Sequence, residues 1–301
     1  METTQPSGIL APALTAFTQQ LEIDAARTFA HFQWLLDQGC DALVVFGTTS
    51  EANSLSVSER TRFLEYAISN GIDPIKLLPG TGCCSLPDSV ELSKHAIGLN
   101  CPAVLMLPPF YYKAVSDEGL FRYFATLIER VGDDRLRVYL YHIPPISQVA
   151  FSFELIQRLT TEFPGVVVGM KDSSGHWEHT RQLIDRFGPA GFRVFPGNEM
   201  RLLPALRAGA KGCISAFANI NPVLLQKVFQ NWQGPEADNL QQEVERQGRA
   251  LRKYPLIPAL KAILAESRKD PGWENIRPPL LGLPAAQREG LLGEWGAAAR
   301  Q

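Results

Sequence analysis

The sequence lacks several features that would place it in a whole class of proteins. Its net charge is −2 at pH 7, so it has no basic surplus with which to bind nucleic acid or an anionic membrane. No apolar run approaches the roughly 18 residues that a membrane-spanning helix needs. Residues 1–6 contain neither a basic nor an apolar segment, so we expect no signal peptide. These absences predict a protein without nucleic-acid or membrane partners.

Cysteine is also scarce. The chain has 5 cysteines in 301 residues, and an odd number without a secretory signal indicates reduced thiols in a cytoplasmic protein. Cys83 and Cys84 are adjacent, and no second pair stands at the spacing of a zinc site. His176 and His179 stand three residues apart, but no clear third ligand accompanies them. We therefore expect no metal site.

What the chain does contain is a regular alternation of short apolar runs and amphipathic segments between residues 8 and 232. The runs predict strands at 8–14, 42–47, 76–80, 103–107, 136–141, 166–171, 192–195 and 212–216. The segments between and after them predict helices at 24–38, 56–70, 88–99, 117–131, 153–163, 177–187, 200–208 and 222–232. Such alternation gives right-handed βαβ units and a parallel sheet, and eight units close into a (β/α)8 barrel.

A doubly wound open sheet is the alternative fold, but no G-x-G-x-x-G motif follows the first strand. After Trp232 the strand pattern stops, and 236–254, 256–268 and 285–299 look helical. Roughly 70 residues are few for an independent domain. The fold class is therefore predicted as α/β, with a (β/α)8 barrel over residues 1–232 and a C-terminal helical extension, 233–301, packed on it.

One predicted strand ends on a lysine. Three valines and Gly-Met precede Lys171, which is typical of a strand buried on both faces. Desolvation disfavours a charged ammonium, so a lysine at such a strand end keeps a larger neutral fraction. A neutral amine attacks a ketone to form a Schiff base. The alternative is a lysine that simply leaves the strand for solvent.

The active site of a (β/α)8 barrel lies at the C-terminal ends of its strands. Polar residues follow the other predicted strands there: Thr15, 47–51, Thr81, 111–113, Tyr141, His142, Ser173, 197–199, Ser215 and Asn219. A lysine within a ring of hydroxyl groups suits an amine nucleophile assisted by a phenol that transfers protons. The structural alternatives are a packed strand aromatic for Tyr141 and turn formers for Thr48 and Thr49.

Four motifs stand at strand ends in this order: Gly-Thr-Thr-Ser-Glu at 47–51, Pro-Phe-Tyr-Tyr at 109–112, Tyr-His-Ile-Pro at 141–144 and Gly-Met-Lys-Asp at 169–172. Together they resemble the dihydrodipicolinate synthase / N-acetylneuraminate lyase family over about residues 8–295. The resemblance implies a TIM barrel and a lyase or aldolase that acts on pyruvate or a 2-oxo(-3-deoxy) acid. It implies a covalent lysine imine, no separate cofactor, and a homotetramer built as a dimer of dimers.

The resemblance also implies catalytic roles. Lys171 matches the Schiff-base lysine, and Tyr141 matches the phenol that moves protons during imine formation and carbon–carbon bond chemistry. Thr48 would relay protons to Tyr141. Tyr112 matches the tyrosine that this family donates to the site of a neighbouring subunit.

Substrate-binding positions follow from the same match. Thr49, with the backbone N–H groups of the turn that begins at Gly47, would hold the carboxylate of the 2-oxo acid. Gly197 and Ile214 match positions that line the lysine. Ser173, two residues after Lys171, is a further candidate for substrate contact.

One position departs from the family pattern. In dihydrodipicolinate synthase an arginine at the position of Ile146 binds the carboxylate of the second substrate, and an apolar side chain cannot provide that clamp. We therefore expect an aldehyde or sugar-acid fragment as the second substrate. Condensation of pyruvate with aspartate semialdehyde, the 4-hydroxy-tetrahydrodipicolinate synthase reaction, is the alternative if Lys113 or Arg201 reaches the site. A catalytically silent relative that binds a 2-oxo acid is the alternative of another class.

Overall fold

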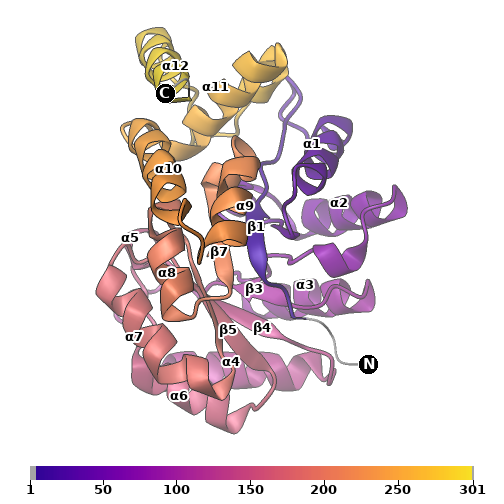
Figure 1. Ribbon diagram of the computed structural model, residues 1–301. Helices are drawn as coiled ribbons and strands as arrows, with labels where there is room; N and C mark the ends of the chain where they lie inside the picture. The colour runs from indigo at the N-terminus through magenta and orange to yellow at the C-terminus, as the bar shows by residue number, and fades with distance from the viewer. Residues whose placement is uncertain (1–4, 300–301) are drawn as a thin grey trace.

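The computed structural model of the chain describes residues 5–299. Parallel strands occupy its centre and helices surround them (Figure 1). The strands are β1 (Gly8–Pro12), β2 (Ala42–Val44), β3 (Val104–Met106), β4 (Val138–His142), β5 (Val167–Asp172), β6 (Arg193–Pro196) and β7 (Gly212–Ile214). The helices are α1 (Ala25–Asp37), α2 (Val57–Ser69), α3 (Leu86–Gly98), α4 (Asp117–Val131), α5 (Pro144–Ser147), α6 (Phe153–Glu162), α7 (Trp177–Phe187), α8 (Leu202–Ala208), α9 (Pro222–Asn231), α10 (Ala237–Leu251), α11 (Leu256–Arg268) and α12 (Ala285–Ala299).

The strands form two parallel groups, in the order β2-β1-β7 and β3-β4-β5-β6. At one seam the N–H of Lys211 donates to the carbonyl of Val194, 3.1 Å away, and this joins the segment before β7 to β6. At the other seam an extended segment lies between β2 and β3. The two groups therefore close into one barrel, and the predicted α/β barrel is confirmed.

The predicted third strand is wrong as a continuous strand. In its place the chain makes two isolated parallel bridges, from Leu77 to Leu43 and from Gly80 to Leu105. Pro79 lies between them and has no N–H to donate, so a regular ladder cannot continue on both sides. The segment still fills the third position of the barrel.

The N-terminal capping residues that the sequence predicts for two helices are present in the structure. Ser56 caps α2 with a full capping box in which Glu59 donates its backbone N–H and accepts from the Ser56 N–H. Ser152 caps α6 by accepting from the N–H of Leu155. The short helix α5 was not predicted. Its two prolines stand in the first turn, where a missing N–H costs nothing.

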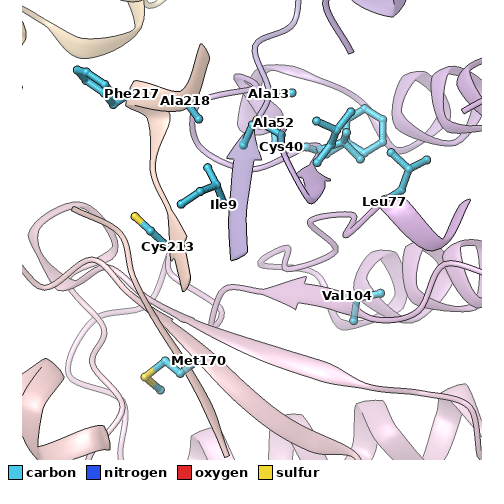
Figure 2. Packing of buried hydrophobic residues seen from close by; sticks show 14 of the residues in the cluster. Ile9, Ala13, Cys40, Ala52, Leu77, Val104, Met170, Cys213, Phe217 and Ala218 are labelled. Atoms are coloured by element: carbon cyan, nitrogen blue, oxygen red, sulfur yellow. The ribbon is translucent and has the colours of Figure 1, made fainter. Parts of the chain in front are cut away.

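Two apolar layers separate the inside of the barrel from the surface of its helices. The inner layer includes Leu10, Val44, Tyr139, Tyr141 and Ile214. The outer layer lies between strands and helices, and Figure 2 shows residues that belong to it: Ile9, Val104, Met170 and Cys213. Neighbours along a strand thus alternate between the two layers, as the pleat requires.

The C-terminal extension packs on one end of the barrel. Helix α10 contacts α8 and α9, and α12 contacts α10 and α11 (Figure 1). Between residues 5 and 299, no helix combines the length and the apolar character that crossing a membrane requires. The boundary at residue 232 stays a prediction.

Candidate active site

A cavity of about 270 Å³ opens at the C-terminal ends of the strands. Seven of the residues with a predicted catalytic or substrate-binding role line it: Thr48, Thr49, Tyr141, Ile146, Lys171, Ser173 and Gly197. The other lining residues are Ile143, Glu199, Ser215, Ala216, Phe217, Leu251, Arg252, Tyr254 and Leu256. The cavity is therefore built from strand ends on one side and from the C-terminal extension on the other.

A β-bulge decides that Lys171 faces the cavity. Along β4 and β5, Val138 pairs with Val167, but the next residue, Tyr139, pairs with Gly169, so one extra residue stands in β5. A shift of one residue exchanges the two faces of a strand, and without this shift the lysine would point at the helices. Gly169 is required there because an added Cβ would overlap the ring of Tyr139.

Lys171 and Tyr141 are paired in the parallel register and face the same cavity. The lysine residue is 5% exposed, and its Nζ lies 4.2 Å from the centroid of the Tyr141 ring. The Tyr141 hydroxyl lies 3.4 Å from Thr48 Oγ1, which is long for a hydrogen bond between hydroxyls. An amine, a phenol and a hydroxyl are thus adjacent, and they can shorten these contacts around a substrate.

Hydrogen bonds within the turn 47–51 and to the segment after β1 fix the position of this turn. Its backbone closes through the N–H of Ser50, which donates to the carbonyl of Gly47 at 3.1 Å. The buried Ser50 hydroxyl donates to the carbonyl of Ala13 at 2.6 Å, and Thr15 donates to the carbonyl of Ser50 at 2.9 Å. These bonds hold Thr48 and Thr49 at the cavity wall.

On the opposite face of the same two strands lies a buried polar cluster. Asp172 accepts from the N–H of Ser174 (3.0 Å), the Thr180 hydroxyl (2.6 Å) and Nδ1 of His179 (3.2 Å). Burial alone would raise the pKa of Asp172, but the hydrogen bonds from His179 and Thr180 outweigh it and the pKa is lowered. Burial lowers the pKa of His142 to about 4, so this imidazole is neutral at pH 7.

His142, Asp172 and His179 are close enough to be considered as metal ligands, because their ligand atoms lie within 4.8 Å of one another. However, Nδ1 of His142 accepts the N–H of Phe151 at 3.2 Å, so the proton of the neutral ring sits on Nε2 and leaves no lone pair there for a cation. The two imidazoles stack at 4.5 Å between centroids and 13° between planes. This geometry favours a structural cluster over a metal centre.

A polar wall closes the cavity near the ends of β6 and β7. Glu199 is 4% exposed; its carboxylate accepts from the Ser215 hydroxyl at 2.6 Å and pairs with Arg252 at 3.2 Å. Arg252 also donates to Oδ1 of Asn198 at 2.6 Å. Helix α10 approaches this closely because its residue 248 is glycine, where an added Cβ would lie 2.8 Å from the Glu199 carboxylate.

Arg252 is the charged site residue that sequence reasoning missed. It stands beyond the last strand, in a segment assigned only to the helical extension, and no motif marks it. The only available signal was Gly248 within a predicted helix, because an isolated helical glycine often marks a close approach. The two cations considered as substitutes for the missing arginine do not line the cavity: Lys113 donates to the carbonyl of Ser147, and Arg201 is exposed.

Three residues with a predicted role lie outside the cavity lining. Gly47 lines a small adjoining cavity, and Ile214 is buried inside the barrel beneath the site. Tyr112 is 73% exposed, and its ring packs edge-on against that of Tyr111, 5.3 Å away. Its role in the site of a neighbouring subunit stays a prediction, because the structure contains a single chain.

Comparison with known proteins agrees with this architecture. The model of the dihydrodipicolinate synthetase family matches residues 5–291. An uncharacterized DapA-like lyase of Chloroflexus aurantiacus is 34% identical over 93% of this chain and 92% of that protein. The 4-hydroxy-tetrahydrodipicolinate synthase of Bacillus subtilis is 28% identical over 92% and 94%. The crystal structure of dihydrodipicolinate synthase from Agrobacterium tumefaciens superposes with a TM-score of 0.91 at 31% identity, covering 97% of this chain and 99% of that one. The chain therefore belongs to the dihydrodipicolinate synthetase family.

Proposed function

We propose that this family member is a Schiff-base lyase or aldolase that acts on pyruvate or a 2-oxo-3-deoxy acid through an imine on Lys171. The observation that carries the proposal is the arrangement of Lys171 and Tyr141: a nearly buried amine 4.2 Å from a phenol ring, with the phenol hydroxyl 3.4 Å from Thr48. At family level, the chain belongs to a family of lyases.

The reaction follows from these groups. The nitrogen lone pair of Lys171 adds to the ketone carbon, and the carbinolamine loses water after Tyr141 supplies a proton to the leaving hydroxyl. In the cleavage direction the Tyr141 phenolate takes the proton of the substrate hydroxyl, the carbon–carbon bond breaks, and its electron pair moves to the nitrogen of the protonated imine. An aldehyde leaves, and Tyr141 returns the proton to carbon of the resulting enamine. Water then hydrolyses the imine and releases pyruvate.

The walls of the cavity suggest the second substrate. Ile146 and Leu256 are apolar, whereas Glu199 offers acceptor oxygens and Arg252 offers N–H donors on the other side. An ion pair of this kind suits hydroxyl groups, which both donate and accept. We therefore assign the second substrate as a hydroxylated aldehyde, released from a 2-oxo-3-deoxy sugar acid.

The runner-up is the 4-hydroxy-tetrahydrodipicolinate synthase reaction. Several relatives carry that name, and Arg252 is one cation at the cavity that can face a second carboxylate. Its guanidinium is already paired with Glu199, which repels a further anion, so we rank this reaction second.

Borohydride trapping tests the proposal. Incubation with pyruvate and sodium borohydride should add the reduced pyruvate adduct to one peptide, the one containing Lys171. Lys171→Ala should abolish the adduct, whereas Lys211→Ala, which changes a lysine outside the cavity, should leave it unchanged. If the wild-type chain binds pyruvate but gains no adduct, and Lys171→Ala binds pyruvate with the same affinity, the catalytically silent binder is supported instead.

A substrate screen then separates the two reactions. Pyruvate release from a panel of 2-oxo-3-deoxy sugar acids is expected, with little condensation of pyruvate with aspartate semialdehyde. If the condensation is faster than every cleavage, the runner-up replaces the first assignment. The homotetramer belongs to the same proposal, and light scattering with Tyr112→Ala tests whether activity depends on an assembled neighbour.

A further inference from the structure

A buried ion pair connects the C-terminal extension to the turn of the candidate site. Lys261, on α11, places its Nζ 2.5 Å from Oε1 of Glu51, the last residue of the turn 47–51. The side chain of Lys261 is 1% exposed and that of Glu51 is 0% exposed. The two residues stand far apart in the sequence, so this pair exists only because the extension packs on the barrel.

The surroundings of the pair also come largely from the extension. Nζ of Lys261 donates to the carbonyl of Asn275 at 2.9 Å, and Oε2 of Glu51 accepts the N–H of Arg277 at 3.3 Å. Oε1 makes no hydrogen bond of good geometry within residues 5–299, which leaves Lys261 as its partner. Nζ lies 4.6 Å from the ring centroid of Phe17, below the turn.

Such a pair is a poor source of stability. Removing two charges from water costs several kcal/mol for each ion, and well-packed apolar residues often serve a core equally well. Burial accordingly lowers the pKa of Lys261 despite the carboxylate beside it. What a buried charged pair supplies and an apolar contact does not is a specific partner for each charge, because either charge would be left unpaired away from water if the two groups separated.

A backbone hydrogen bond connects Glu51 to the part of the turn that lines the cavity. The N–H of Glu51 donates to the carbonyl of Thr48 at 3.0 Å, so a displacement of Glu51 moves the threonine turn with it. Glu51 also has a φ of 57°, a left-handed conformation that costs free energy for a non-glycine residue. The ion pair opposes the relaxation of this strained residue.

We propose that Lys261 and Glu51 are positioning residues, through which the C-terminal extension sets the geometry of the turn that binds the carboxylate of the 2-oxo acid. The proposal rests on the proposed function and on the carboxylate-binding role that the family resemblance implies for Thr49. It assigns the extension a part in substrate affinity as well as in packing.

The test distinguishes an effect on the geometry of the turn from an effect on the stability of the fold, because both charges are removed together. In Glu51→Gln/Lys261→Met no unpaired buried charge remains, so the melting temperature should stay near that of the wild type. The pyruvate concentration that gives half-maximal borohydride trapping should rise about tenfold or more, since small misplacements of binding groups cost this much. The trapping rate at saturating pyruvate should change little, because Lys171 and Tyr141 are untouched.

A matched control is Arg27→Met/Asp270→Asn. It removes another ion pair between barrel and extension, 2.7 Å long, whose residues do not line the cavity. This variant should trap pyruvate with wild-type half-saturation. Wild-type half-saturation in Glu51→Gln/Lys261→Met as well would overturn the inference.

If the double variant does not fold, Glu51→Asp decides the matter, because it keeps the charges and shortens the reach by one methylene. Its half-saturation should also rise, and an unchanged value would overturn the inference. Failure of the proposed function looks different, since the wild-type chain itself would then give no adduct at any pyruvate concentration.

Discussion

The two faces of β4 and β5 differ in how their polar groups are satisfied. On the cavity face, the Tyr141 hydroxyl makes one long contact with Thr48, and the Lys171 amine approaches the Tyr141 ring. On the helix face, one residue further along each strand, Asp172 accepts three hydrogen bonds and His142 accepts one. The same register therefore produces a sparsely hydrogen-bonded pair on the cavity face and a more extensively hydrogen-bonded cluster on the helix face.

This difference indicates a division of roles. A nucleophile and a proton donor need free lone pairs and protons to meet a substrate, so bonding them fully within the protein would block the reaction. Their positions must then be fixed by something else. The polar cluster on the helix face fixes these positions because it anchors the strand ends to α7, as a supporting layer does for a preorganised site.

The largest effect is expected from Tyr141→Phe, which removes a hydroxyl on the cavity face. Turnover should fall by about 10²–10⁴-fold, the usual worth of a positioned general acid–base. The melting temperature should change little, because within residues 5–299 the hydroxyl makes only one long contact. Steady-state pyruvate release and thermal melts check both parts.

Tyr139→Phe is the matched control for that variant. Tyr139 points into the same barrel two residues earlier, and its hydroxyl donates to Gln5 at 2.7 Å, away from the cavity. This variant should retain turnover. If both tyrosines behave alike, the catalytic difference between the cavity face and the rest of the barrel is not supported.

The next largest effect is expected on the helix face, from Asp172→Asn. The amide would turn N–H groups toward donors that now approach the carboxylate, so stability should fall by about 2–3 kcal/mol. Turnover per folded molecule should fall much less than in Tyr141→Phe. Thermal melts and active-site titration measure the two effects, with the exposed Asp134→Asn as the control. A loss of turnover as large as that of Tyr141→Phe would assign the cluster a direct catalytic role.

The cavity face was largely predictable from sequence, and the helix face was not. Lys171 ends an apolar run, and Tyr141 and Thr48 stand in motifs at other strand ends, so local patterns are sufficient to place them. The bulge that turns Lys171 inward depends on pairing with β4, and no local pattern reveals it. The contacts of Asp172 with Thr180 likewise require the packing of α7.

Long-range contacts account for the other omissions. Arg252 and Lys261 reach the site or its turn from the C-terminal extension, whose place on the barrel is set by packing rather than by any motif. The third strand was overpredicted because an apolar pattern does not register the missing N–H of Pro79. Local patterns thus predicted most of the elements together with Lys171, Tyr141 and Thr48, whereas the residues that hold these three in place could be identified only from the fold.

A smaller effect is expected from Thr48→Val, which removes the hydroxyl contact of Tyr141 at 3.4 Å. Turnover should fall by roughly tenfold, about the worth of one hydrogen bond between uncharged groups. Thr48→Ser keeps the hydroxyl and should recover most of the activity, as steady-state pyruvate release would show. Equal activity in Thr48→Val and the wild type would remove threonine from the proton pathway and leave Tyr141 to exchange protons with substrate or water.

The smallest effect concerns the pH dependence of stability on the helix face. The pKa of His142 is about 4 in the folded chain, mainly because of burial, with Asp172 raising it and His179 lowering it, and about 6.5 in an unfolded chain. A folded pKa below the unfolded one gives a stabilising contribution that is complete above pH 6.5 and is lost as the pH falls toward 4. His142→Phe removes this titration, so its melting temperature should fall less than that of the wild type between pH 7 and pH 5. Some slope should remain, because burial also lowers the pKa of His31, to about 3. If the melting temperature depends on pH identically in the two proteins, His142 is already accessible to protons. The polar cluster on the helix face would then be less shielded from solvent than its hydrogen bonds indicate.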